Sequence, residues 1–298
     1  MKILLFIIGI TCLLNPLAMG EETTSTFVLT KEDFNNANAD DIALLFKIGG
    51  ARVNVSQVDD NDTIVKAVVT FDSENTGPTF RTSESGSTFT AEFVSGNDVD
   101  RFDRFDRFDF SASIERWEIT IGNYDTDTDL TMNAGGATGN IDFGGMPIKD
   151  CMLNLGGASL SIDFSTPTTR QVDDFVINGG GINISISNIG NTDFKRLNLL
   201  GGGNNVELDF RGSYESEQHD VTVTSAGGLM DIIVPSDSGE KLNVFSIGTL
   251  VTVQGPGWER TFNSFISKNY ITEGYSDQDT KIDMNITGVG SIISVDRE

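Results

Sequence analysis

Several residue types are scarce in this sequence, and each scarcity excludes a kind of protein or site. The 298 residues include two cysteines, six prolines and one histidine, and 20 basic residues face 44 acidic ones, for a net charge of −24 at pH 7. Phosphate backbones repel such an acidic chain, which disfavours nucleic acid as a partner. One histidine and no metal-spaced cluster of cysteine and histidine disfavour a zinc site. We interpret the excess of carboxylates as a means of keeping the protein soluble.

Long apolar runs are also missing, apart from one at the N-terminus. Lys2 precedes an apolar run over residues 3–14, and the small residues Ala18 and Gly20 stand three and one positions before Glu21. This pattern predicts a secretory signal peptide over residues 1–20. A run of about a dozen residues is too short to span a bilayer, which takes roughly 20. We therefore expect an exported, soluble mature chain with no transmembrane segment.

Cysteine is too scarce to support a disulfide framework. Cys12 lies in the predicted signal peptide and follows Thr11, a poor context for lipid attachment. Only Cys151 remains after cleavage, so the mature chain has no internal disulfide. Cys151 begins a strand-like run on its inward phase, where we expect a buried thiol that packs as a small hydrophobe.

Glycine, in contrast, is abundant and marks a repeat. Glycine groups begin at residues 135, 156, 179, 201, 227 and 248, at steps of 21, 23, 22, 26 and 21 residues. Each group separates two short alternating runs, as in two strands joined by a turn. A period of this size indicates units that bury their apolar faces on one another. The predicted fold class is all-β, a β-solenoid similar to a right-handed β-helix, with two-stranded rungs of ~22 residues and glycine turns.

The alternation within each repeat assigns side chains to an inner and an outer face. Inward apolar pairs are expected to stack into columns. The pairs are Ile141 and Phe143, Ile162 and Phe164, Ile184 and Ile186, Leu208 and Phe210, and Ile232 and Val234. An outward row is expected from Asp142, Asp163, Ser185 and Asp209, about 4.8 Å apart. Such a row invites Ca²⁺, but solvated carboxylates explain it more simply, and we assign no metal.

Less regular segments flank the repeats. Residues 42–55 match the repeat once more, strand-like runs at 64–71, 88–93 and 116–121 predict antiparallel hairpins, and residues 281–293 predict a last rung. Because the ends of a stack expose apolar edges, we expect the hairpins to cap one end and the last rung, with a loop over 258–275, to cap the other.

This organisation divides the chain into five parts. They are a signal peptide (1–20), an N-terminal arm (21–41), an N-terminal rung with a hairpin cap (42–129), the repeat solenoid (130–254), and a loop with a terminal capping rung (255–298).

Four short motifs, at residues 48–51, 116–121, 153–158 and 288–292, together resemble the toast-rack family. These are bacterial cell-envelope β-repeat domains, related to the extracytoplasmic part of LiaF-type envelope-stress regulators and to adhesin-like surface proteins. The resemblance covers roughly residues 42–295. It implies a β-solenoid in the bacterial envelope, periplasmic or at the cell surface, with no known catalysis, cofactor or catalytic residues. The predicted signal peptide distinguishes this chain from the membrane-bound members.

The inventory of reactive residues favours binding over catalysis. Each glycine group is followed by a strand, whereas phosphate-binding loops precede a helix, so no nucleotide is expected. His219 lies in a polar connection, where we expect a solvated side chain. Residues 124–130 resemble the start of a calcium loop but lack its glycine and distal glutamate, and we interpret them as a polar turn. We expect a non-enzymatic structural or adhesin-like surface; the alternative is a carbohydrate-active β-helix enzyme, a polysaccharide lyase or hydrolase.

Two surface features remain as candidate binding sites. Stacking would align Lys149, Lys195, Arg196 and Lys241 into a basic seam that could hold an anionic envelope polymer, although neighbouring acids offer local pairing instead. The other feature is the triplet repeat of arginine, phenylalanine and aspartate over residues 101–110. Its period of three fits neither strand nor helix, so we interpret it as a loop, with a partner-docking segment as the alternative. The expected partner is an envelope protein or polysaccharide.

Overall fold

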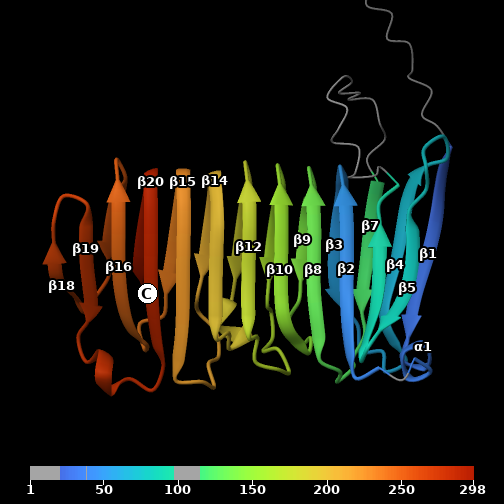
Figure 1. Ribbon diagram of the computed structural model, residues 1–298, viewed down its shortest axis with the longest axis horizontal. Coiled ribbons are helices and arrows are strands. Elements are labelled where there is room, and N and C mark those ends of the chain that lie inside the picture. The colour runs from blue at the N-terminus through green and yellow to red at the C-terminus, as the bar shows by residue number, and fades with distance from the viewer. Residues whose placement is uncertain (1–20, 38, 97–114) are drawn as a thin grey trace, which may run out of the picture.

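The computed structural model describes residues 21–37, 39–96 and 115–298, which form an elongated all-β array (Figure 1). The predicted signal peptide and the triplet repeat over 101–110 lie outside these residues. The one α-helix in the described part, α1 (Lys31–Asn35), is five residues long and begins with a capping box between Thr30 and Asp33. No helix of the described part has the length and apolar character needed to cross a membrane.

Parallel strands form two ladders that run along the molecule. The first ladder follows the order β6 (Thr88–Val94), β2 (Asp41–Gly49), β8 (Thr128–Gly135), β10 (Ile148–Gly156), β12 (Asp174–Gly180), β14 (Arg196–Asp209), β15 (Gln218–Val234), β20 (Lys281–Arg297) and β16 (Gly239–Ile247). The second ladder follows β7 (Glu115–Ile121), β3 (Ala51–Gln57), β9 (Thr138–Asp142), β11 (Ser159–Asp163), β13 (Asn183–Ser187), the second halves of β14, β15 and β20, and β17 (Leu250–Gln254). Each rung thus contributes one strand, or half of a long strand, to each ladder.

Glycines make the turn between the two halves of a rung, as predicted. Gly136 and Gly157 have φ angles of +66° and +59°, a region that a Cβ atom disfavours. No atom lies within 4 Å of a Cβ built at Gly157, so backbone conformation rather than crowding requires glycine there. The line of these turns is called the glycine corner below.

The core lies between the ladders, and every residue of the predicted inward pairs is buried. The register differs from the expected one at β13: Ile162 lies beside Ile141 and Ile186, whereas Ile184 lies beside Leu160. Paired residues are 21 positions apart between β9 and β11 but 24 apart between β11 and β13, because the connection from β11 to β12 is longer than that from β9 to β10. The match therefore shifts by two residues while keeping the inward phase. Cys151 is buried as predicted, and burial raises the pKa of its thiol.

The N-terminal end corrects one prediction. β6 and β7, expected in antiparallel hairpins, are a further rung, parallel to β2 and β3 respectively. Residues 97–114 occupy the place in the sequence where other rungs have a glycine turn, which hides the period. The buried Glu115 carboxylate accepts hydrogen bonds from Ser95 Oγ, Gly96 N and Trp117 Nε1 and joins the two strand ends. Antiparallel strands do follow outside this rung: β5 (Thr79–Ser85) pairs with β6, β4 (Thr63–Asp72) pairs with β7, and β1 (Glu22–Thr30) pairs with β4.

The position of the last rung at the C-terminal end also differs from the prediction. The last rung, β20, was expected to cap the stack, but it lies between β15 and β16, and Figure 1 shows it inside the array. The predicted loop over 258–275 is instead a hairpin of β18 (Trp258–Asn263) and β19 (Ser267–Thr272), and β19 pairs antiparallel with β16. Residues 255–280, which connect β17 to β20, are long enough for the chain to return and insert β20 between β15 and β16. The inserted position gives β20 a hydrogen-bonded neighbour on each edge, while its inward residues are buried in the core.

Candidate functional site

A polar trough of about 380 Å³ crosses the outer face of the second ladder. It extends over β9, β11, β13, β14 and β15. Its polar side chains form two parallel rows, because outward positions of neighbouring strands align in register. The rows are Ser159, Asn183 and Asn205, and Asn140, Ser161, Ser185, Glu207 and Asp231.

The two rows differ in how many of their hydrogen-bonding groups are already used. Asn205 donates to Asn183 (2.7 Å) and Asn183 donates to Ser159 (3.2 Å), which orders the first row. In the second row, Ser161, Ser185 and Asp231 make no side-chain hydrogen bond within the described part of the chain. The trough therefore presents an ordered edge beside free donors and acceptors.

A second polar strip lies on the outer face of the first ladder in the same region. Asn178 donates to Asn154 (2.9 Å), and Asn154 donates to Asn133 (2.8 Å), across β12, β10 and β8. These asparagines line a hollow of about 430 Å³ beside the glycine corner. Sequence reasoning missed both surfaces. Their signal in the sequence was a recurring Asn or Ser at outward positions next to the glycines. Such residues are common on any solvent-exposed strand, so they indicate a surface site only when the strand register is known.

The predicted outward row is only partly assembled. Asp142 and Asp163 are neighbours, but Ser187 rather than Ser185 lies beside Asp163. Asp142 accepts hydrogen bonds from Ser165 Oγ (2.6 Å) and from the Gly144 and Ser165 N–H groups. Asp209 pairs with Arg211 at 2.7 Å. Because these carboxylates have protein partners, they hold local turns, and the described residues contain no group of three or more His, Cys, Asp or Glu placed to hold a metal ion.

The basic residues of the predicted seam stand among acids. One outward row of the first ladder reads Asp129, Asp150, Asp174, Arg196, Asp220, Asp283 and Lys241 across adjacent strands. Arg196 makes two 2.6 Å hydrogen bonds to Asp174, and Lys195 pairs with Asp173. Lys149 precedes Asp150 at an irregularity of β10. Two aspartates separate Arg196 from Lys241, so the seam stays a prediction, with its bases spaced along an acidic row.

The pKa values in this row follow the pairing. The hydrogen bonds from Arg196 lower the pKa of Asp174. At the unpaired end, burial and then the neighbouring Asp150 carboxylate raise the pKa of Asp129. The negative charge of this row is therefore partly neutralised, and it is not uniform along the row.

His219 is not solvated, contrary to prediction. Its ring is fully buried between Phe194 and Tyr214, with centroid distances of 5.2 Å and 4.6 Å. Ring nitrogens Nδ1 and Nε2 lie 2.5 Å and 2.9 Å from the carbonyl oxygens of Phe194 and Ser216. The connection folds back over the end of the core, which carries this histidine inside. Its role is to join two successive connections.

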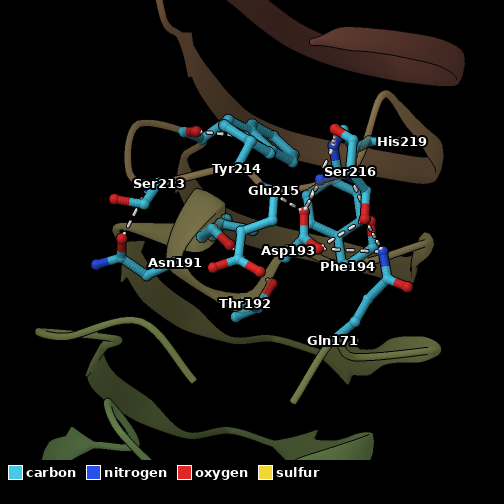
Figure 2. Close-up of polar contacts among 12 residues, drawn as sticks. Gln171, Asn191, Thr192, Asp193, Phe194, Ser213, Tyr214, Glu215, Ser216 and His219 are labelled. Carbon is cyan, nitrogen blue, oxygen red and sulfur yellow. Dashed lines mark hydrogen bonds and ion pairs between the residues drawn. The ribbon is translucent and has the colours of Figure 1, made fainter. Parts of the chain in front are cut away.

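Asp193 organises the same connections, as Figure 2 shows. Its carboxylate accepts hydrogen bonds from the Glu215 N–H (3.0 Å), the Ser216 N–H (2.9 Å) and hydroxyl (2.7 Å), and the Gln171 amide (3.2 Å). Asp193 has a φ angle of +45°, an uncommon value for a residue with a Cβ atom. The network ties three successive connections together, so this corner is a structural clamp.

Replacing Asp193 with alanine is expected to lower the free energy of unfolding by about 2 to 3 kcal/mol, because the Glu215 and Ser216 N–H groups and the Ser216 hydroxyl lose a charged acceptor. Asp193→Asn should cost less, since asparagine keeps one acceptor oxygen and tolerates left-handed backbone. Urea unfolding of the three proteins measures the order. Equal stability of Asp193→Ala and the parent would contradict the clamp.

The fold and its outer faces define an all-β repeat protein whose polar surfaces spread along strands without converging on a reactive centre in the described residues. Residues 19–186, more than half of the chain, match the family described as the N-terminal domain of toast_rack, DUF2154. The chain therefore belongs to the toast-rack family. No curated protein matches it.

Two solved structures are similar to this chain. One is a "putative cell adhesion protein" from Clostridium sporogenes, with 12% identity and a TM-score of 0.47 over 93% of this chain and 100% of that one. The other is a "putative adhesin" from Parabacteroides merdae, with 10% identity and a TM-score of 0.36 over 93% of this chain and 96% of that one.

Proposed function

We propose that this protein is an exported, non-enzymatic β-solenoid of the bacterial cell envelope that acts as an adhesin-like surface, and that its polar trough binds an envelope polysaccharide. The observation that carries the proposal is the trough itself, with free Ser161, Ser185 and Asp231 beside an ordered row of Asn and Ser. Five strands at about 4.8 Å give it a length of roughly 19 Å, which suits an extended polymer.

The chemistry of the lining matches a polyhydroxylated ligand. Asparagine amides and serine hydroxyls both donate and accept hydrogen bonds, as sugar hydroxyls do. Glu207 and Asp231 add acceptors at one end of the trough. A polyanion would meet these carboxylates without a base of the lining to pair with, so a neutral polymer suits the trough better.

The arrangement supports binding rather than cleavage. A glycosidase needs two carboxyl groups on opposite sides of the scissile bond, with separated pKa values. Glu207 and Asp231 lie side by side in one row on adjacent strands. This geometry offers acceptors to one face of a ligand.

The test is retention on purified peptidoglycan sacculi and on the neutral envelope polysaccharide fraction. Ser161→Leu with Ser185→Leu fills the trough and should reduce retention at least tenfold, by roughly 1.4 kcal/mol or more. The matched control is Thr131→Leu with Asn198→Leu on the first ladder, in the outward row where Leu45 already stands. Equal retention by the trough variant, or none by the parent, would refute the proposal.

The same assay separates the trough from the predicted seam. Charge reversal of Lys195, Arg196 and Lys241 to glutamate should leave retention on the neutral fraction unchanged. Loss of retention in this variant, with full retention in the trough variant, would assign binding to the seam.

A further inference from the structure

Exposed apolar side chains gather at the glycine corner of the last rungs. Eight such residues, each between 43% and 97% exposed, form what we call the C-terminal apolar corner. They are Leu229, Phe245, Ile247, Leu250, Phe265, Ile266, Val289 and Ile292. In Figure 1 this corner lies where the arrow of β16 ends, beside the connection between β18 and β19.

The strand register makes these residues contiguous. On the second ladder, Leu229, Ile292 and Leu250 are neighbours across β15, β20 and β17. On the first ladder, Val289 lies beside Ile247. Turns at Gly290 and Gly248 join the two rows. The hairpin adds Ile266, whose carbonyl accepts a hydrogen bond from Ser246 N, and Phe265 next to it. These residues therefore form one contiguous apolar ridge.

The fold does not require apolar residues at these positions, because earlier rungs place other residues there. The row that ends in Leu229, Ile292 and Leu250 begins with Arg52, Thr138, Ser159, Asn183 and Asn205. The row that ends in Val289 and Ile247 begins with glycines and Ala226. Each of these rungs turns at a glycine with a positive φ angle, so the apolar residues of the last three serve something other than the turn. Large exposed apolar patches mark interaction sites.

The corner also lacks charge in a strongly acidic protein. Residues 221–230, 242–254, 261–267 and 284–295 contain no Asp, Glu, Lys or Arg. Asp220 and Asp283 stand at the other end of these strands, about 20 Å away at 3.3 Å per residue. Salt screens charges over about 8 Å at physiological ionic strength. The charges of Asp220 and Asp283 are therefore screened at this corner, and repulsion between two copies is limited to groups at its border, such as Asp231 two residues beyond Leu229.

A free strand edge borders the corner. β17 begins at Leu250 and pairs with β20 and with no other strand of the described residues. Its five residues include no charge and no proline, the usual protection of an exposed edge. A partner that covers the apolar corner also shields this edge from unspecific pairing.

We propose that two copies of this protein associate through the C-terminal apolar corner, with the acidic rows on the outside of the dimer. A two-fold arrangement places the same ridge on both sides, the usual form of a homodimer interface. Apolar side chains form the centre, and the partly exposed Thr249 and Ser264 supply a polar rim.

Sedimentation equilibrium of residues 21–298 tests this at micromolar concentration. The parent should have twice the monomer mass. Leu229→Asn, Leu250→Thr and Ile292→Asn, combined, introduce residue types that earlier rungs carry at these positions and should keep the melting temperature. Loss of three apolar contacts should raise the dimer dissociation constant at least 100-fold. Met152→Thr, an exposed apolar residue far from the corner, is the control and should leave the dimer unchanged.

Three outcomes would overturn the proposal. The parent could sediment as a monomer, or the triple variant could keep the dimer. A monomeric parent that floats with phosphatidylcholine vesicles while the triple variant does not would assign the corner to a lipid surface. Leu229 continues the first row of the trough beyond Asn205, whereas Ser161 and Ser185 lie on earlier rungs. Ser161→Leu with Ser185→Leu therefore tests polysaccharide retention while the corner stays unchanged.

Discussion

Replacing Ile162 with aspartate (Ile162→Asp) should abolish the cooperative melting transition. Ile162 is fully buried in the column between Ile141 and Ile186. Losing its side chain and burying an unpaired carboxylate should cost at least about 5 kcal/mol. Since domains are stable by only about 5 to 15 kcal/mol, this loss is comparable with the whole. Leu208→Asp, in the same column one strand beyond Ile186, should behave alike.

Ser161→Asp is the matched control, because Ser161 is the adjacent, outward and exposed residue. Its effect should stay within about 0.5 kcal/mol. Circular dichroism melting compares the three variants with the parent. A native melting curve for Ile162→Asp would contradict the phase assigned to the second ladder.

Replacing Arg297 with methionine (Arg297→Met) should lower the free energy of unfolding at neutral pH by about 3 to 5 kcal/mol, because it leaves a buried carboxylate without its countercharge. Arg297 Nε donates to the fully buried Glu240 at 2.9 Å. The same guanidinium donates to the carbonyl oxygens of Ser236, Ser238 and Pro256, and so fixes β20 between its neighbours.

The loss should depend on pH with a definite sign. Burial raises the pKa of Glu240 above its ordinary value of 4.5. A carboxyl group with a raised pKa binds its proton more tightly in the folded state. Its contribution to stability is therefore most favourable below the ordinary pKa and is lost as pH rises through the folded value. Without Arg297 the pKa should rise further, so the deficit of Arg297→Met should be smaller near pH 5 than near pH 7.

Urea unfolding at both pH values measures this, and the double variant Arg297→Met with Glu240→Gln is the control. Removing the carboxylate should recover part of the stability and remove the added pH dependence. A deficit that is the same at both pH values would show that Arg297 acts through its carbonyl contacts and not through Glu240.

The core residues of this protein could be predicted from the sequence because strand alternation and glycine turns are local properties. Ile162, Leu208 and Phe164 were assigned to the core from their phase alone, and all are buried. The register was harder to predict, since the longer connection between β11 and β12 moved Ile186 and Ser187 into the places expected for Ile184 and Ser185. The polar composition around His219 led to the wrong prediction that its side chain is solvated, whereas the polar segment folds over the core and buries the ring.

Rung order and surfaces depend on contacts between distant segments. Any rung with the same inward apolar pattern fits anywhere in a stack, so nothing local to residues 281–297 distinguishes a cap from an insertion between β15 and β16. For the same reason the polar trough and the C-terminal apolar corner were not visible as units, because their residues lie about one repeat apart in the chain.

The sequence by itself determined the all-β class, the glycine turns, the inward columns and the toast-rack resemblance, since each follows from a pattern within one repeat. Only the tertiary structure decided which rungs are neighbours, which carboxylates are already paired, and where outward side chains join into surfaces. The physical reason is that parallel stacking aligns residues one repeat apart, and the length of each connection sets that alignment.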